Sequence, residues 1–108
     1  MVDFEPARGS EANKRRPAII VSNDVGNRTA TRMGRGVLTV VPITSNVERI
    51  YPFQVLLPSG TGGLPYDSKA QAEQVRSVDT ERVGASLGNL PGQLMTSLEN
   101  ALRLHLAL

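Results

Sequence analysis

Residues 37–44, VLTVVPIT, decide the fold class of this 108-residue chain. The segment is short, apolar and rich in β-branched side chains, a pattern typical of a buried β-strand. Pro42 has no N–H to donate to a ladder, so we expect it at an edge or a bulge where the strand ends. Earlier in the chain, residues 17–22, PAIIVS, show the same pattern and predict another buried strand.

Two more strands and a turn are expected further along the chain. YPFQVLL at residues 51–57 predicts a third strand, and SGTGG at residues 59–63 predicts a turn. QVRSV at residues 74–78 predicts a fourth strand. Gln74 and Arg76 would share one face of it, because alternate side chains of a strand point the same way.

The C-terminal segment predicts a helix that opens at Leu90 and Pro91, since proline suits the first turn of a helix. Short strands followed by one helix predict a mostly β, largely antiparallel fold capped by a C-terminal α-helix. At this length residues 1–108 are expected to form a single domain. One stripe of the helix collects Leu94, Leu98, Ala101, His105 and Leu108.

The composition excludes several kinds of chemistry. The chain has no cysteine and one histidine, so disulfides, zinc thiolate sites, cysteine nucleophiles and histidine pairs are excluded. Its carboxylates are scattered singly, so a catalytic metal has no evident ligands and no cofactor is expected. No apolar run approaches the roughly 18 residues of a membrane span, and the N-terminus lacks a signal-peptide pattern. We therefore expect a cytoplasmic protein without a membrane segment.

Positive charge is concentrated in the N-terminal third. Residues 1–35 hold seven basic and four acidic side chains, a net charge of +3, whereas residues 36–108 hold five basic and six acidic ones, a net charge of −1. A basic region on a small chain suggests a polyanionic partner such as a nucleic acid or an acidic peptide.

Arg16 and Thr44 are the residues best placed for chemistry. Arg16 precedes the strand at residues 17–22, and Pro17 favours an extended backbone that directs the arginine side chain. Thr44 ends the strand at residues 37–44. If the two strand ends lie side by side, a guanidinium and a hydroxyl flank one site that can bind a phosphate and stabilise charge on its oxygens.

Five short segments, taken in order, resemble the MazF/PemK family of toxins from bacterial toxin–antitoxin pairs. Each segment alone is a weak signal, but their order and spacing follow the family over nearly the whole chain. The segments are Gly9-Ser10-Glu11, Arg16-Pro17-Ala18-Ile19-Ile20-Val21, Val41-Pro42-Ile43-Thr44-Ser45, Tyr51-Pro52-Phe53-Gln54-Val55 and Glu73-Gln74-Val75-Arg76-Ser77.

The resemblance implies a small Src-homology-3-like barrel that works as a homodimer. It also implies a metal-independent, sequence-specific endoribonuclease that cleaves single-stranded RNA and mRNA, and a MazE-like antitoxin that covers the RNA site with an acidic segment. Arg16 and Thr44 match the family's catalytic arginine and threonine. The positions that match its RNA contacts are Ser10, Glu11, Gln74 and Arg76.

One departure from the family leaves alternatives open. Members usually carry an R-G-D/E-I-W-like stretch before the segment that begins here at Met1, so the first strand is expected to be shortened and closure of the barrel is in question. A non-catalytic RNA-binding barrel is one alternative. A CcdB-like gyrase poison is another, although those proteins use an aromatic residue at the C-terminus and this chain ends His-Leu-Ala-Leu.

Overall fold

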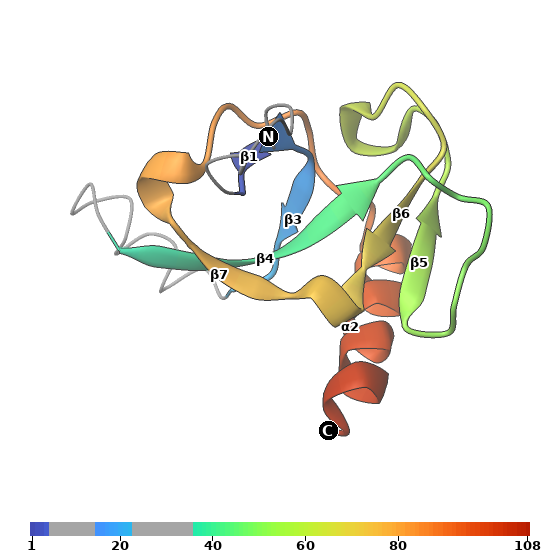
Figure 1. Cartoon of the computed structure of the whole chain (residues 1–108). Helices are drawn as coiled ribbons and strands as arrows, with labels where there is room; N and C mark the ends of the chain where they lie inside the picture. The colour runs from blue at the N-terminus through green and yellow to red at the C-terminus, as the bar shows by residue number, and fades with distance from the viewer. Residues whose placement is uncertain (5–14, 23–35) are drawn as a thin grey trace, which may run out of the picture.

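The computed structural model of the chain describes residues 1–4, 15–22 and 36–108 (Figure 1). This part contains several short strands, and one long helix follows them. Short 3₁₀ turns flank the later strands at Thr61–Gly63, Ala72–Gln74 and Thr80–Arg82. The strands and the helix are β1 (Val2–Asp3), β2 (Arg15–Arg16), β3 (Ala18–Ile20), β4 (Val37–Thr44), β5 (Gln54–Leu57), β6 (Ser68–Gln71), β7 (Arg76–Asp79) and α2 (Gly92–Leu106).

β4 is the strand around which the others are arranged, and its bounds match the predicted strand. β3 pairs with one edge of β4. On the other edge β7 pairs with residues 37–40 and β6 pairs with residues 43–44, while β5 pairs with the far side of β6. Each of these pairs is antiparallel, so the predicted fold class, mostly β and antiparallel with a C-terminal helix, is confirmed.

Pro42 lies inside β4, at the point where the partner strand changes. Val40 is the last residue paired with β7, and Ile43 is the first paired with β6. Ile43 donates its N–H to the Pro17 carbonyl on the β3 side at 3.0 Å. Because successive residues face opposite edges, the nitrogen of Pro42 faces the gap between β7 and β6. Its missing N–H therefore interrupts no ladder. Pro42 lies where the partner of β4 changes from β7 to β6, and not at an edge or a bulge as predicted.

The N-terminal residues contact residues 83–85, which follow β7 in the chain. β1 pairs with β2, and Val2 forms an isolated antiparallel bridge with Val83. Gly84 donates its N–H to the Met1 carbonyl at 2.8 Å, and the Met1 amino group donates to the Ala85 carbonyl at 3.3 Å. Burial lowers the pKa of this amino group. The described strands form a two-stranded and a five-stranded sheet, and these contacts join β1 to the segment that follows β7.

Two apolar clusters form the core. In the larger one, Leu98 and Ala101 of α2 belong to the same cluster as Val41 and Leu57 of the sheet. The smaller one joins β1 to β4 and β7. Its buried members are Val2, Phe4, Val40 and Val78.

α2 follows the predicted apolar stripe over its first part only. Leu98 and Ala101 are buried, and Leu94 packs against the core. The C-terminal turns of the helix project away from the sheets (Figure 1), so His105 and Leu108 are exposed. Periodicity located the buried face correctly, but it carries no information on where the sheet beneath the helix ends. No helix in the described ranges is long and apolar enough to span a bilayer.

Two predicted strands have different bounds in the structure. β5 begins at Gln54, because the Gln54 side chain accepts a hydrogen bond from the Tyr51 N–H at 3.1 Å and closes a turn before the strand. β7 begins at Arg76, and Gln74 lies in the preceding 3₁₀ turn. β6 has no counterpart among the predicted strands. Its sequence, SKAQ, contains one apolar residue, although its first three residues are buried.

Candidate active site

Arg16 is the last residue of β2 and has the extended backbone that Pro17 predicts. The N–H of Ile43 donates to the carbonyl of Pro17 at 3.0 Å, so these two residues lie opposite each other. Continuing the antiparallel register by one residue places Arg16 opposite Thr44. The two side chains that the sequence predicts at one site therefore come from adjacent strand ends.

Thr44 is half-buried, and a hydrogen bond orients its side chain. Its Oγ1 accepts the N–H of Asn46 at 3.2 Å, and the Asn46 Oδ1 accepts the N–H of Glu48 at 3.2 Å. A hydroxyl has one donor hydrogen and two acceptor lone pairs. Because the bond from Asn46 uses an acceptor position, the hydroxyl hydrogen of Thr44 can still be donated to an anion.

A depression of about 320 Å³ opens beside these strand ends. Arg16 and Thr44 line it, together with Tyr66 and Ser68. The Ser68 hydroxyl donates to the Tyr66 carbonyl at 2.9 Å, which fixes the backbone of this segment. Tyr66 is a site residue that the sequence analysis did not single out, since no short motif surrounds it and only the turn that folds it back brings it here.

The depression offers a cation and a hydroxyl to a ligand. A guanidinium binds two oxygens of a phosphate through two parallel N–H···O hydrogen bonds. A neighbouring hydroxyl can donate a further hydrogen bond to the same phosphate. In the described part of the chain, no three His, Asp or Glu side chains come together as ligands of a metal ion. The guanidinium of Arg16 and the hydroxyl of Thr44 are donors that can stabilise an anion electrostatically.

Arg76 lies away from this depression. It pairs with Val40, which is about 13 Å from Thr44 along β4. Its guanidinium donates to the Phe4 carbonyl at 3.3 Å and lies 5.0 Å from the centroid of the Phe4 ring. These two contacts fasten Phe4, the second residue after Val2 and the one that follows β1, to β7.

Gln74, another predicted substrate contact, is not among the described residues that line the depression. Gln74 is exposed in the 3₁₀ turn Ala72–Gln74, so it does not share a strand face with Arg76 as predicted. The difference arises because residues 72–74 turn before the strand begins. Ser10 and Glu11 lie outside the described residues.

Lys69 is a second residue near the site that the sequence analysis missed. It lies on β6, where it pairs with Thr44 of β4, and it is only 8% exposed. Its Nζ donates to the Arg49 carbonyl at 2.7 Å and lies 5.9 Å from the centroid of the Tyr51 ring. Lys69 thus ties the loop after Thr44 to β6. A lysine in a polar segment predicts an exposed side chain, so no sequence signal pointed to this role.

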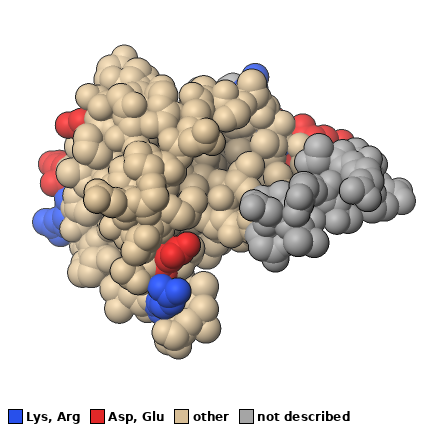
Figure 2. All heavy atoms as spheres, turned by 180° about the vertical axis from the view of Figure 1, so that it is seen from behind, with Lys and Arg blue, Asp and Glu red and all other residues tan. Residues whose placement is uncertain are grey.

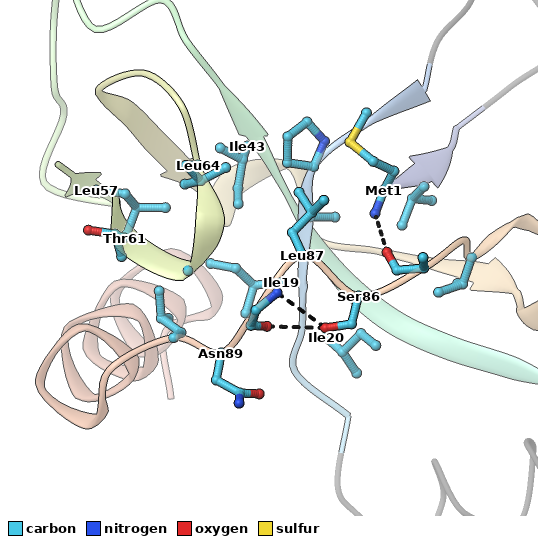
Figure 3. Close-up of a pocket in the computed structure, with 18 of the residues that line it drawn as sticks. Met1, Ile19, Ile20, Ile43, Leu57, Thr61, Leu64, Ser86, Leu87 and Asn89 are labelled. Atoms are coloured by element: carbon cyan, nitrogen blue, oxygen red, sulfur yellow. Dashed lines mark hydrogen bonds between the residues drawn. The ribbon is translucent and has the colours of Figure 1, made fainter. Parts of the chain in front are cut away.

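A second hollow, of about 310 Å³, lies against β3 and the segment 84–90 (Figure 3). Ile19, Ile20 and Leu87 are among the mostly apolar residues that line it. Ser86 exchanges two hydrogen bonds of 3.3 Å with the backbone of Gly88 and so stiffens this segment. None of its described lining residues has a charged side chain, so the Arg16–Thr44 depression is the better site for binding an anion.

Residues 1–106 match the family model of PemK-like, MazF-like toxins of type II toxin–antitoxin systems. The chain belongs to this family. The resemblance inferred from five short segments is thereby confirmed. Among curated relatives, the chain is 59% identical to endoribonuclease MazF9 of Mycobacterium tuberculosis over 107 residues, which cover 99% of this chain and 91% of the relative.

Solved structures agree with the family assignment. MazF from Deinococcus radiodurans superposes with a TM-score of 0.74 at 27% identity, covering 99% of this chain and 90% of that one. A MazE–MazF structure from the same organism gives a TM-score of 0.70 at 28% identity, covering 86% of each chain. The fold of this chain is that of the MazF toxins.

Proposed function

We propose that this MazF-family toxin is a sequence-specific endoribonuclease that cleaves single-stranded RNA, mRNA included, without a metal ion. The observation that carries the proposal is the placement of Arg16 opposite Thr44 at the edge of one depression. The name of the 59% identical relative supports the enzyme class. Cleavage of mRNA would inhibit translation and growth, and residues 1–108 would act as one toxin domain.

In the proposed reaction the RNA supplies its own nucleophile. The 2′-oxygen attacks the adjacent phosphorus, and the bond from phosphorus to the 5′-oxygen breaks. The 2′-hydroxyl loses a proton and the leaving 5′-oxygen gains one, which yields 2′,3′-cyclic phosphate and 5′-hydroxyl ends. Arg16 holds the phosphate oxygens and stabilises their growing charge. The hydroxyl of Thr44 donates a hydrogen bond to the same phosphate. A guanidinium keeps its proton, so the main role of Arg16 is electrostatic.

Incubation of the purified chain with a long single-stranded RNA in excess EDTA tests this function. We expect discrete fragments with 2′,3′-cyclic phosphate and 5′-hydroxyl ends, because fixed protein donors replace a metal ion. Sequencing of the fragment ends would locate the cleavage sites. Cleavage that appears only after magnesium is restored would contradict the mechanism. RNA that is bound and stays intact would instead support a non-catalytic binding module.

The proposal includes a homodimer held by the end of α2. Leu104, Leu106 and Leu108 are 58%, 49% and 85% exposed at the end of the helix, and a second copy of the chain would cover part of this apolar surface. Figure 2 shows the molecule from behind, where Lys, Arg, Asp and Glu side chains lie mostly near the margins and a red and a blue group lie side by side in the lower middle. Light scattering at tens of micromolar should give twice the 11.6 kDa of one chain, and Leu104→Lys should lower that mass. A monomer mass for the unchanged chain would rule out the dimer.

A MazE-like antitoxin is the proposed protein partner. A MazF relative has been solved as a MazE–MazF structure, and an acidic segment would complement the exposed guanidinium of Arg16. An RNA substrate of this kind places the toxin in the cytoplasm. RNA contacts at Ser10, Glu11, Gln74 and Arg76 stay predictions that rest on the family resemblance.

A further inference from the structure

We propose that Tyr66 is a stacking platform for the RNA base next to the scissile phosphate. The inference rests on the proposed function and deepens it, since it names a residue that binds the substrate beside Arg16 and Thr44. Its role is to raise the affinity for RNA. The cleavage chemistry itself stays with the guanidinium and the hydroxyl.

The first observation is the unusual exposure of the Tyr66 ring. Tyr66 is 69% exposed, although it lines the same depression as Arg16 and Thr44. Tyr51, by contrast, is stacked on Phe53 with ring centroids 5.4 Å apart and planes 3° apart. In the described part of the chain, no other ring or cation packs on Tyr66. Its aromatic face is therefore available to a ligand.

The second observation is that hydrogen bonds hold the chain at Tyr66 and directly after it. The Ser68 hydroxyl donates to the carbonyl of Tyr66 at 2.9 Å. The next residue, Asp67, accepts the N–H of Ser59 through Oδ1 at 2.8 Å. A tyrosine on a fixed backbone offers a large contact area with few rotatable bonds, so binding a base orders little of the protein.

The geometry of a nucleotide connects Tyr66 to the reacting group. A phosphate held by Arg16 and Thr44 leaves the attached base one ribose away, still beside the depression. Tyr66 lines this depression, and the other aromatic residues that the structure describes do not. The bases of single-stranded RNA are free to stack on aromatic side chains. Stacking tolerates any base, because every base has a π-face, so it affects affinity more than the choice of sequence.

The test uses a short RNA that spans a mapped cleavage site and carries 2-aminopurine beside the scissile phosphate. A 2′-O-methyl group at that site blocks cutting. We expect the fluorescence of 2-aminopurine to be quenched when the unchanged chain binds. Tyr66→Leu should weaken binding and raise KM about 10- to 100-fold, abolish that quenching and leave the cleavage positions unchanged. Tyr66→Phe should behave like the unchanged chain, because it retains the ring.

Tyr51→Leu is the matched control, since it removes a tyrosine outside the depression and should leave KM unchanged. Circular dichroism checks the fold, and Tyr66→Ser repeats the test if Tyr66→Leu does not fold. Normal KM and retained quenching in a folded Tyr66 variant would overturn the inference while leaving the endoribonuclease proposal intact. RNA that the unchanged chain neither binds nor cuts would contradict both.

Discussion

Arg16→Ala should lower the rate constant of RNA cleavage about 10²- to 10³-fold, the usual effect of removing one preorganised donor from an oxyanion. The Arg16 side chain is exposed at the edge of the depression, so its removal leaves no cavity in the core. Arg16→Lys should restore little activity, because lysine lacks the planar fork that binds two phosphate oxygens. Single-turnover cleavage of one mapped RNA in EDTA measures the rate constant for each variant.

Arg103→Ala is the matched control for charge. Arg103 is exposed on α2 and donates to Asn100 Oδ1 at 3.0 Å, far along the chain from the depression. The Arg103→Ala variant should cleave RNA at the rate of the unchanged chain. Thr44→Val removes the second donor to the same phosphate, and residues that act as a unit are not additive. The double variant with Arg16→Ala should therefore be hardly slower than Arg16→Ala alone. Normal cleavage by Arg16→Ala would contradict the assigned site.

The fold was predictable where burial leaves a pattern in the sequence. β4 matches its predicted bounds, because a run of β-branched residues has the composition of a buried strand. α2 begins at Gly92, close to Leu90 and Pro91, where the helix was predicted to open. β6 was not predictable in this way, since the buried Lys69 satisfies its ammonium on a backbone carbonyl that only the tertiary structure supplies. The Gln54 side chain accepts the N–H of Tyr51, and the turn that this bond closes shortens β5 at its start.

The candidate site was predictable to the extent that it depends on strand ends. Arg16 and Thr44 each border a predicted buried strand, and they were expected to flank one site if the two strand ends lay side by side. The register does place them opposite each other. Tyr66 belongs to a segment that reaches the depression through a turn, and no periodicity describes such a path. Arg76 was placed on the right strand, but its contact with Phe4 depends on residues far away in the sequence.

Gly63→Ala should cause a large loss of stability. Gly63 has φ +81°, a conformation that costs a side chain about 1–2 kcal/mol. An added Cβ would also overlap the carbonyl oxygen of Leu87 and lie 3.2 Å from its carbonyl carbon. Both are backbone atoms, so the turn at Thr61–Gly63 must move away from Leu87. The free energy of unfolding should fall by about 3 kcal/mol or more, measured by urea denaturation at one protein concentration.

Gly60→Ala separates the two causes of this loss. Gly60 has a similar φ of +88°, but an added Cβ meets no atom within 4 Å. Gly60→Ala should lower the free energy of unfolding only by the cost of the positive φ. The difference in that free energy between the two variants therefore measures the cost of the contact with Leu87. Because Leu64 follows Gly63 and lines the Arg16–Thr44 depression, Gly63→Ala should also slow cleavage, whereas Gly60→Ala should not. Equal losses of stability in both variants would show that the contact between the added Cβ and Leu87 contributes nothing.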